Sequence, residues 1–219
     1  VRDPAYTGDK IVDYMAPGQH VGSRITFNNR GTQAIRDLVL CDVIDRTAFD
    51  LGTSFSARVV MERADPVSPQ YGVHRNSPYF SSIDTSRGPR AETGSEPGNS
   101  DYSNAACDDP NITWYDSPEA ARTGGGASFV RAVIPRLPAG RSSHLYIEGL
   151  QLRDTWASTI DVQYPKAEAR VAGQPIAEDT VLRNLAWVSS SNMPAETLRV
   201  MNRSLRDHLQ VKRARTTTV

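Results

Sequence analysis

The sequence has no excess of either charge and no long hydrophobic run. Its 219 residues include 25 Lys and Arg and 25 Asp and Glu, so the formal net charge is zero. A dedicated nucleic-acid-binding protein normally shows a strong basic excess, so we expect no nucleic-acid partner. No stretch holds the roughly 18 consecutive apolar residues of a transmembrane helix, and we expect no membrane span. Zero net charge also removes self-repulsion between copies, which suits a chain that works inside an assembly.

The sequence patterns of catalysis and metal binding are missing as well. There is no Gly-x-Ser-x-Gly nucleophile elbow, no phosphate-binding loop and no recognisable pair of catalytic carboxylates. The four histidines are far apart, and none has a partner at metal-ligand spacing: His20, His74, His144 and His208. The acidic stretch at residues 108–111 does not follow the EF-hand spacing, so we interpret it as a solvated loop. We therefore expect a non-catalytic protein without a metal or another cofactor.

Cysteine is scarce, with Cys41 and Cys107 alone. A disulfide between them would close a loop of roughly 65 residues and stabilise the fold by about 3–4 kcal/mol. Two reduced thiols, one in a strand and one in a loop, are the alternative, and the spacing leaves both open. The first residue is Val1, and no apolar signal-peptide core follows it. We expect the chain to be a processed or excised piece of a longer polypeptide.

Short strands separated by turns make up most of the sequence. Residues 20–28 alternate, with Val21, Ser23, Ile25 and Phe27 on one face, which is the period of two that a strand requires. Further strands are predicted at residues 10–15, 34–44, 55–62, 128–134, 142–152, 159–164 and 181–189, with another short one within 167–176. Proline and glycine mark the turns between them. These strands predict an all-β protein, an antiparallel β-sandwich with Greek-key connections.

Two regions depart from this strand pattern. Residues 65–127 are rich in Ser, Gly, Pro, Asn and Asp and predict a long loop insertion within a β-sandwich domain of residues 1–192. Within it, Trp114 and Tyr115 are the best candidates for ligand-binding aromatic residues. Residues 193–219 form the second region.

A C-terminal amphipathic helix is predicted over residues 194–213. The Ser-Asn-Met-Pro run at residues 191–194 is typical of a helix start. Apolar residues then recur at three- or four-residue spacing, at Leu198, Met201, Leu205 and Leu209. The apolar stripe of this helix would pack either on its own sandwich or on a neighbouring subunit.

The order of the turns and strands resembles the conserved-repeat, adhesin-like domains of bacterial and archaeal surface proteins, often described as a domain of unknown function. The residues that carry the resemblance span most of the chain: Lys10, Pro17, Gly18, Asn29, Gly31, Asp42, Leu137, Pro138, Ala139, Gly140, Asn184, Ala186 and Val188. The resemblance implies an immunoglobulin-like sandwich in an extracellular or cell-surface protein, commonly one module of a stalk. The long insertion and the C-terminal helix are not part of the family's pattern.

Some surface sandwiches of this general kind contain a spontaneous Lys–Asn isopeptide bond. Its chemistry needs a buried neutral lysine, an asparagine carboxamide within reach and a protonated carboxyl group that polarises the carboxamide. We assign these roles as a hypothesis to Lys10, Asn184 and Asp42, with Glu148 as the alternative carboxyl. The competing interpretation is a solvated Lys10 at a sheet edge and a turn-capping Asn184.

These observations favour a structural module of an extracellular or cell-surface assembly, such as a stalk, filament, sheath or surface layer. Its partners would be other proteins or copies of itself, held through the 194–213 helix and the 65–127 insertion. An adhesin that binds a carbohydrate or protein through the long loop is the alternative. A virion shell or decoration protein is a further alternative, because a sandwich with a long arm can tile a surface.

Overall fold

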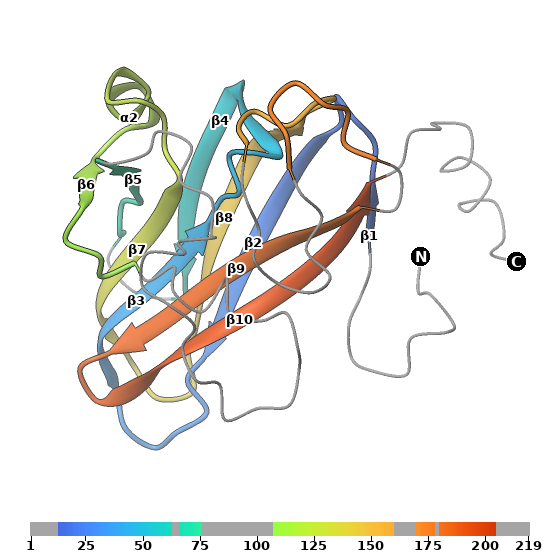
Figure 1. Cartoon of the computed structure of the whole chain (residues 1–219). Helices are drawn as coiled ribbons and strands as arrows, with labels where there is room; N and C mark the ends of the chain where they lie inside the picture. Colours follow the sequence, from blue (N-terminus) through green and yellow to red (C-terminus); the bar gives the residue numbers. More distant parts are fainter. Residues whose placement is uncertain (1–12, 63–65, 76–106, 160–169, 178–179, 205–219) are drawn as a thin grey trace, which may run out of the picture.

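A computed structural model describes residues 13–62, 66–75, 107–159, 170–177 and 180–204 of the chain (Figure 1). Almost all regular structure in these residues is β-strand, and the one helix among them is α2 (Pro118–Thr123). The strands, in chain order, are β1 (Asp13–Met15), β2 (His20–Asn28), β3 (Ile35–Val43), β4 (Phe49–Met61), β5 (Gln70–His74), β6 (Ile112–Tyr115), β7 (Phe129–Leu137), β8 (Ser142–Leu152), β9 (Val181–Ser190) and β10 (Met193–Ser204).

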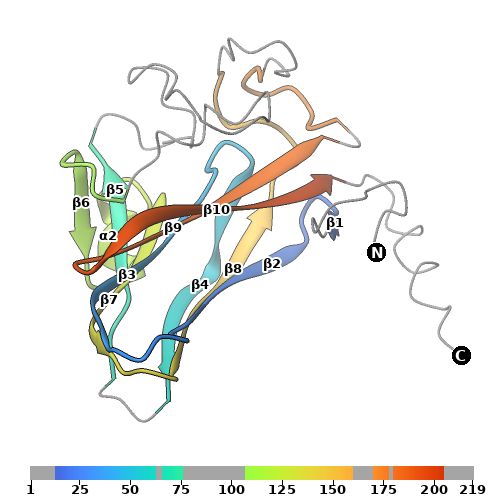
Figure 2. The same ribbon diagram turned by 90° about the horizontal axis from the view of Figure 1, so that it is seen from below.

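These strands form two sheets that lie face to face (Figures 1 and 2). The larger sheet has seven strands in the order β1-β10-β9-β3-β7-β5-β6, and the smaller has the order β2-β8-β4. The strand pairs are antiparallel, with the exception of β1 and β10, which run parallel. The prediction of an all-β protein built from two antiparallel sheets is confirmed.

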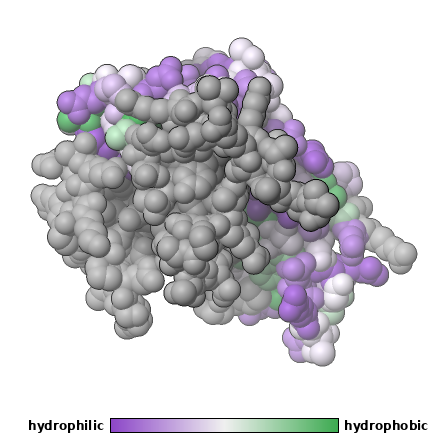
Figure 3. All heavy atoms as spheres, turned by 90° about the vertical axis from the view of Figure 1, so that its right-hand side faces the viewer, coloured by the Kyte–Doolittle hydropathy of each residue, from purple (hydrophilic) through white to green (hydrophobic). Residues whose placement is uncertain are grey.

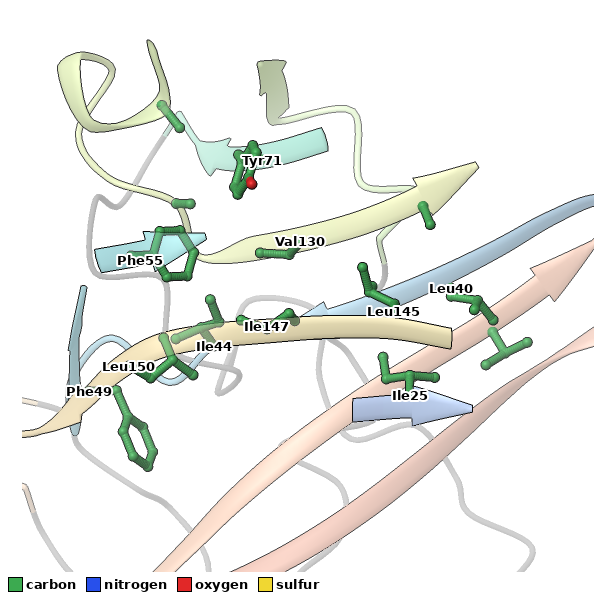
Figure 4. Packing of buried hydrophobic residues seen from close by; sticks show 14 of the residues in the cluster. Ile25, Leu40, Ile44, Phe49, Phe55, Tyr71, Val130, Leu145, Ile147 and Leu150 are labelled. Carbon is green, nitrogen blue, oxygen red and sulfur yellow. The ribbon is translucent and has the colours of Figure 1, made fainter. Parts of the chain in front are cut away.

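The inner faces of the two sheets form the main hydrophobic core (Figure 4). On β3 of the larger sheet, Leu38 and Leu40 are fully buried, and on β8 of the smaller sheet Leu145 and Ile147 face them from across the core. Each pair is two residues apart, as the alternation of a strand requires. Burying each such side chain contributes about 1.5–3 kcal/mol relative to leaving it exposed.

Polar contacts also join the two sheets. The Ser23 hydroxyl on β2 donates a hydrogen bond to Oδ2 of Asp42 on β3. On the β4 side, the backbone N–H of Ala57 donates to the Tyr71 hydroxyl at 3.0 Å, and the Tyr71 ring meets Phe55 edge to face at 5.8 Å. Burial raises the pKa of Tyr71 above its ordinary value, although the Ala57 N–H acts in the opposite direction. The phenol therefore stays neutral and accepts this bond between the sheets.

A buried ion pair closes the corner between β3 and β4. Nη1 of Arg170 lies 2.6 Å from Oδ2 of Asp45 and 2.7 Å from the Thr47 hydroxyl. Thr47 donates its own N–H and hydroxyl to Oδ1 of Asp45. The Arg170 guanidinium also lies over the Trp156 ring, 4.4 Å from its centroid. These contacts attach the segment after β8 to the corner, with all four side chains buried.

The C-terminal helix predicted over residues 194–213 is wrong over residues 194–204, which belong to strand β10. The Ser191 and Asn192 pair that indicated a helix cap instead makes the turn of the β9–β10 hairpin, hydrogen-bonded to the backbone of Arg36 and Ala34. The apolar residues of this segment recur at helical spacing, but the segment is a strand because β10 pairs with β9 in a long antiparallel register. Residues 205–213 of the predicted helix lie outside the described residues.

The predicted long insertion contains regular structure that sequence reasoning missed. Strands β5 and β6 and helix α2 all lie within residues 65–127. Helix α2 begins at a cap in which Ser117 accepts a hydrogen bond from the Ala120 N–H at 3.1 Å, with Pro118 next to it. Residues 76–106 lie outside the described residues, as does most of the strand predicted at 159–164.

The described surface that is visible from the β1 side is mainly polar. Seen from the β1 side, the described atoms belong mostly to hydrophilic residues, with hydrophobic ones showing in small areas (Figure 3). Among the described side chains, the large hydrophobic residues classed as exposed are Val60, Val133 and Val171, each less than 40% exposed. The helix in the described part of the chain is far too short to cross a membrane.

We predict that Arg170→Ala lowers the free energy of unfolding by about 3–5 kcal/mol, because it leaves the buried Asp45 carboxylate without its cation. Urea denaturation of the oxidised protein measures the change. The control is Glu62→Gln, which removes an exposed ion pair to Arg141 at 3.7 Å and should cost about 0–1 kcal/mol. Equal effects of the two substitutions would contradict a structural role for the buried pair.

Candidate functional site

Cys41 and Cys107 form a disulfide on the outer face of the seven-stranded sheet, with their Cα atoms 6.4 Å apart. Both residues are buried, and a second hydrophobic cluster surrounds them. Of the two alternatives that the sequence left open, the disulfide is the one present, and it ties the central strand β3 to the segment that precedes β6. Because the bridge spans 66 positions of sequence, it fixes the spatial relation between two distant parts of the chain.

Trp114 lies on this same outer face and is part of its packing. Its ring meets Phe129 edge to face at 6.3 Å, and the Arg131 guanidinium lies 3.8 Å from its centroid. Gly72 lies beneath the two aromatic residues, and a Cβ there would come within 2.9 Å of both. Nε of Arg131 donates to Gln70 at 2.9 Å, and burial lowers the pKa of Arg131 from its ordinary value. The Trp114 ring is therefore held in place by its neighbours.

Tyr115 lies on the opposite face of β6, because successive side chains of a strand alternate. Its hydroxyl packs against Gly124, where a Cβ would come within 2.5 Å of the oxygen. It lines a pocket of about 430 Å³ beside the residues that follow α2. The two aromatic residues predicted as a binding pair therefore do not form a common platform.

In the acidic segment before β6, Asp109 is buried, whereas Asp108 is exposed. Oδ1 of Asp109 accepts hydrogen bonds from the backbone N–H of Asn111 at 2.8 Å and from its side chain at 3.0 Å. Oδ2 of Asp109 lies 3.7 Å from Nε2 of His74, and both side chains are buried. The expectation of a solvated loop is wrong for Asp109. Within the described residues, no three His, Cys, Asp or Glu side chains gather in a way that could hold a metal ion.

Of the residues assigned to the hypothetical isopeptide bond, the structure describes Asp42, Asn184 and Glu148. Asp42 is 1% exposed on the inner face of β3, as the chemistry of a protonated carboxyl requires. On the neighbouring strand β9, Asn184 is two residues from Ala186, the residue opposite Asp42. Glu148, the alternative carboxyl, is 60% exposed and lies 3.8 Å from Arg58, so it does not share this buried environment. Lys10 lies outside the described residues.

No protein-family model matches this sequence, and no curated protein matches it.

Sequence reasoning missed the contacts of His74, Asp109 and Arg131, because each of these contacts joins residues that are more than 30 positions apart. The strand character of residues 112–115 was the one signal that could have indicated them, since it places alternate residues on opposite faces.

We predict that replacing both cysteines with alanine lowers the free energy of unfolding by about 4 kcal/mol, because the unfolded chain gains the entropy that the bridge removes. Urea denaturation with and without dithiothreitol measures the difference. The reductant should destabilise the wild-type protein and leave the double variant unchanged. A wild-type protein that is indifferent to the reductant would contradict the prediction.

Proposed function

We propose that this chain is a structural module of an extracellular or cell-surface assembly. The observation that carries the proposal is a two-sheet sandwich whose central strand β3 is crosslinked by the Cys41–Cys107 disulfide. Disulfides form and persist in oxidising compartments, outside the cytosol. The partners are other proteins or copies of this chain. Such a module keeps its shape while neighbouring parts of an assembly attach to it.

An immunoglobulin-like arrangement is part of this proposal. The chain alternates between the two sheets from β1 to β5 and again from β7 to β9, as a sandwich with crossing connections does. The buried Asp45–Arg170 pair supports the same role, since it holds a connecting segment rigidly on the sheet corner. Rigidity of the connections suits a module that transmits position rather than one that changes conformation.

An adhesin is the second candidate function. One observation favours it: Arg75 and Cys107, the described residues that flank residues 76–106 in the sequence, both adjoin the disulfide-bonded part of the larger sheet. Recognition loops are commonly displayed on rigid scaffolds of this kind. A virion shell or decoration protein is the third hypothesis, and shells seen by electron microscopy of purified material would favour it over the other two.

We predict that the protein carries its disulfide in the intact native cells and is degraded by protease added outside them. Acid-quenched samples are treated with a maleimide-coupled polymer before and after reduction, and gel mobility shows the number of free thiols. The expected result is no shift before reduction and two additions after it. The variant without cysteines should show neither. Two free thiols together with protection from external protease would contradict an extracellular role.

The crosslink hypothesis gives a separate prediction. If Lys10 and Asn184 form an isopeptide bond, the intact mass of the reduced protein is lower than the sequence mass by one ammonia. Asp42→Ala should restore the full mass, because the carboxyl that polarises the carboxamide is gone. Glu148→Gln is the control and should keep the loss, since Glu148 is exposed. An unmodified wild-type mass would rule out the bond.

A further inference from the structure

The pocket beside Tyr115 has the features of a small binding site. It has a volume of about 430 Å³, within the range typical of ligand sites. It lies between the antiparallel pair β5 and β6 and the residues that follow α2, which are near each other at the β6 end of the larger sheet (Figure 1). The described residues that line it include His74, Arg75, Thr113, Tyr115, Thr123 and Gly124.

The polar groups of the pocket suit an anion with neighbouring hydroxyl groups. Arg75 supplies a permanent positive charge, and no carboxylate belongs to the described residues that line the pocket. Nε of Arg75 donates to the Thr113 hydroxyl at 3.1 Å, so the Thr113 hydrogen is available for another acceptor. The Thr123 hydroxyl donates to the Glu119 carbonyl at 3.2 Å and can itself accept from a ligand. Tyr115 adds a third hydroxyl.

These groups are positioned before any ligand arrives. The backbone N–H of Arg75 donates to the Asn111 carbonyl at 2.9 Å, and Asn111 is bound in turn to Asp109. Asp109 lies next to His74 and two residues from the disulfide at Cys107. Preorganised groups lose little conformational entropy on binding, which favours affinity. The disulfide thereby supports the pocket from outside it.

We propose that this pocket binds a uronic acid unit of an acidic polysaccharide. The carboxylate would accept hydrogen bonds from the Arg75 guanidinium and the Thr113 hydroxyl, as charged pairs of this kind do. The ring hydroxyls would pair with Tyr115 and Thr123. A single guanidinium matches the single charge of a carboxylate, whereas phosphate sites usually combine several cations or a helix N-terminus. An acidic peptide side chain would use Arg75 but leave the hydroxyls unpaired. The proposal does not depend on the structural role proposed above.

Isothermal titration of the full, oxidised chain with a tetrasaccharide of alternating glucuronic acid and N-acetylglucosamine tests the site. We expect binding by the wild type, a loss of about tenfold or more in Arg75→Gln, and a smaller loss in Thr113→Val. The matched control is Arg136→Gln, which removes an exposed arginine at the other end of β7 and should bind like the wild type. Thermal unfolding verifies that each variant is folded.

Gly124→Ala provides an independent variant, since its added Cβ would displace the Tyr115 hydroxyl and weaken binding without changing any charge. The carboxyl-reduced tetrasaccharide should bind at least tenfold more weakly than the acidic form. Acetate, inorganic phosphate and an acidic peptide complete the ligand set. No binding of the acidic tetrasaccharide, equal losses in Arg75→Gln and Arg136→Gln, or equal or tighter binding of any of these three ligands would overturn the proposal.

Discussion

Burial of the two inner sheet faces against each other is the constraint on which the rest of the structure depends. Leu38 and Leu40 on one sheet and Leu145 and Ile147 on the other are wholly excluded from water, and a register slip of one residue in β3 or β8 would turn them away from this core. With the inner faces fixed, the outer face of β3 is fixed too. Cys41 must then point outward, away from the core, and its disulfide has to form on the surface side of the larger sheet. The outer cluster and the segment before β6 follow from that position.

The sequence predicted strand positions best where one face of a strand is buried and the other is exposed to solvent. Residues 20–28 and 142–152 were predicted to the residue as β2 and β8, because their alternation reflects a sheet with one covered face. It was least informative in β10, whose leucine and methionine spacing suits either a helix or a strand. Pairing with β9 decides that case, and pairing is a long-range property that a local period does not contain.

The contacts between polar side chains were harder to predict than the strands. Asp45 and Arg170 are 125 positions apart, and nothing next to either residue in the sequence indicates that they meet in a buried ion pair. Arg75 and Thr113 become neighbours only because β5 and β6 pair across a long stretch rich in Ser, Gly, Pro, Asn and Asp. Trp114 and Tyr115 were predicted as ligand-binding aromatic residues, but their adjacency in sequence suggested one surface, whereas a strand places them on two. Predicting a strand at residues 112–115 would have placed the two side chains on opposite faces and corrected that interpretation.

The arrangement of the outer strands bears on how a module of this kind would respond to tension. β1 and β10 are parallel neighbours, with Asp13 opposite Asn202 and Met15 opposite Ser204, so tension along the chain pulls the two strands in opposite directions. Hydrogen bonds that cross between the strands then share the load instead of breaking in turn. The contact between β1 and β10 is short. The next strand pair in the sheet is β10 with β9, which has a longer register, and the pair after it is β9 with β3. At β3, the disulfide prevents residues 42–106 from being extended, even when the hydrogen bonds between the strands have broken. The covalent bond thus lies on a strand that tension through this edge of the sheet reaches only after β10 and β9, where it protects the part of the fold that also carries the Arg75 pocket.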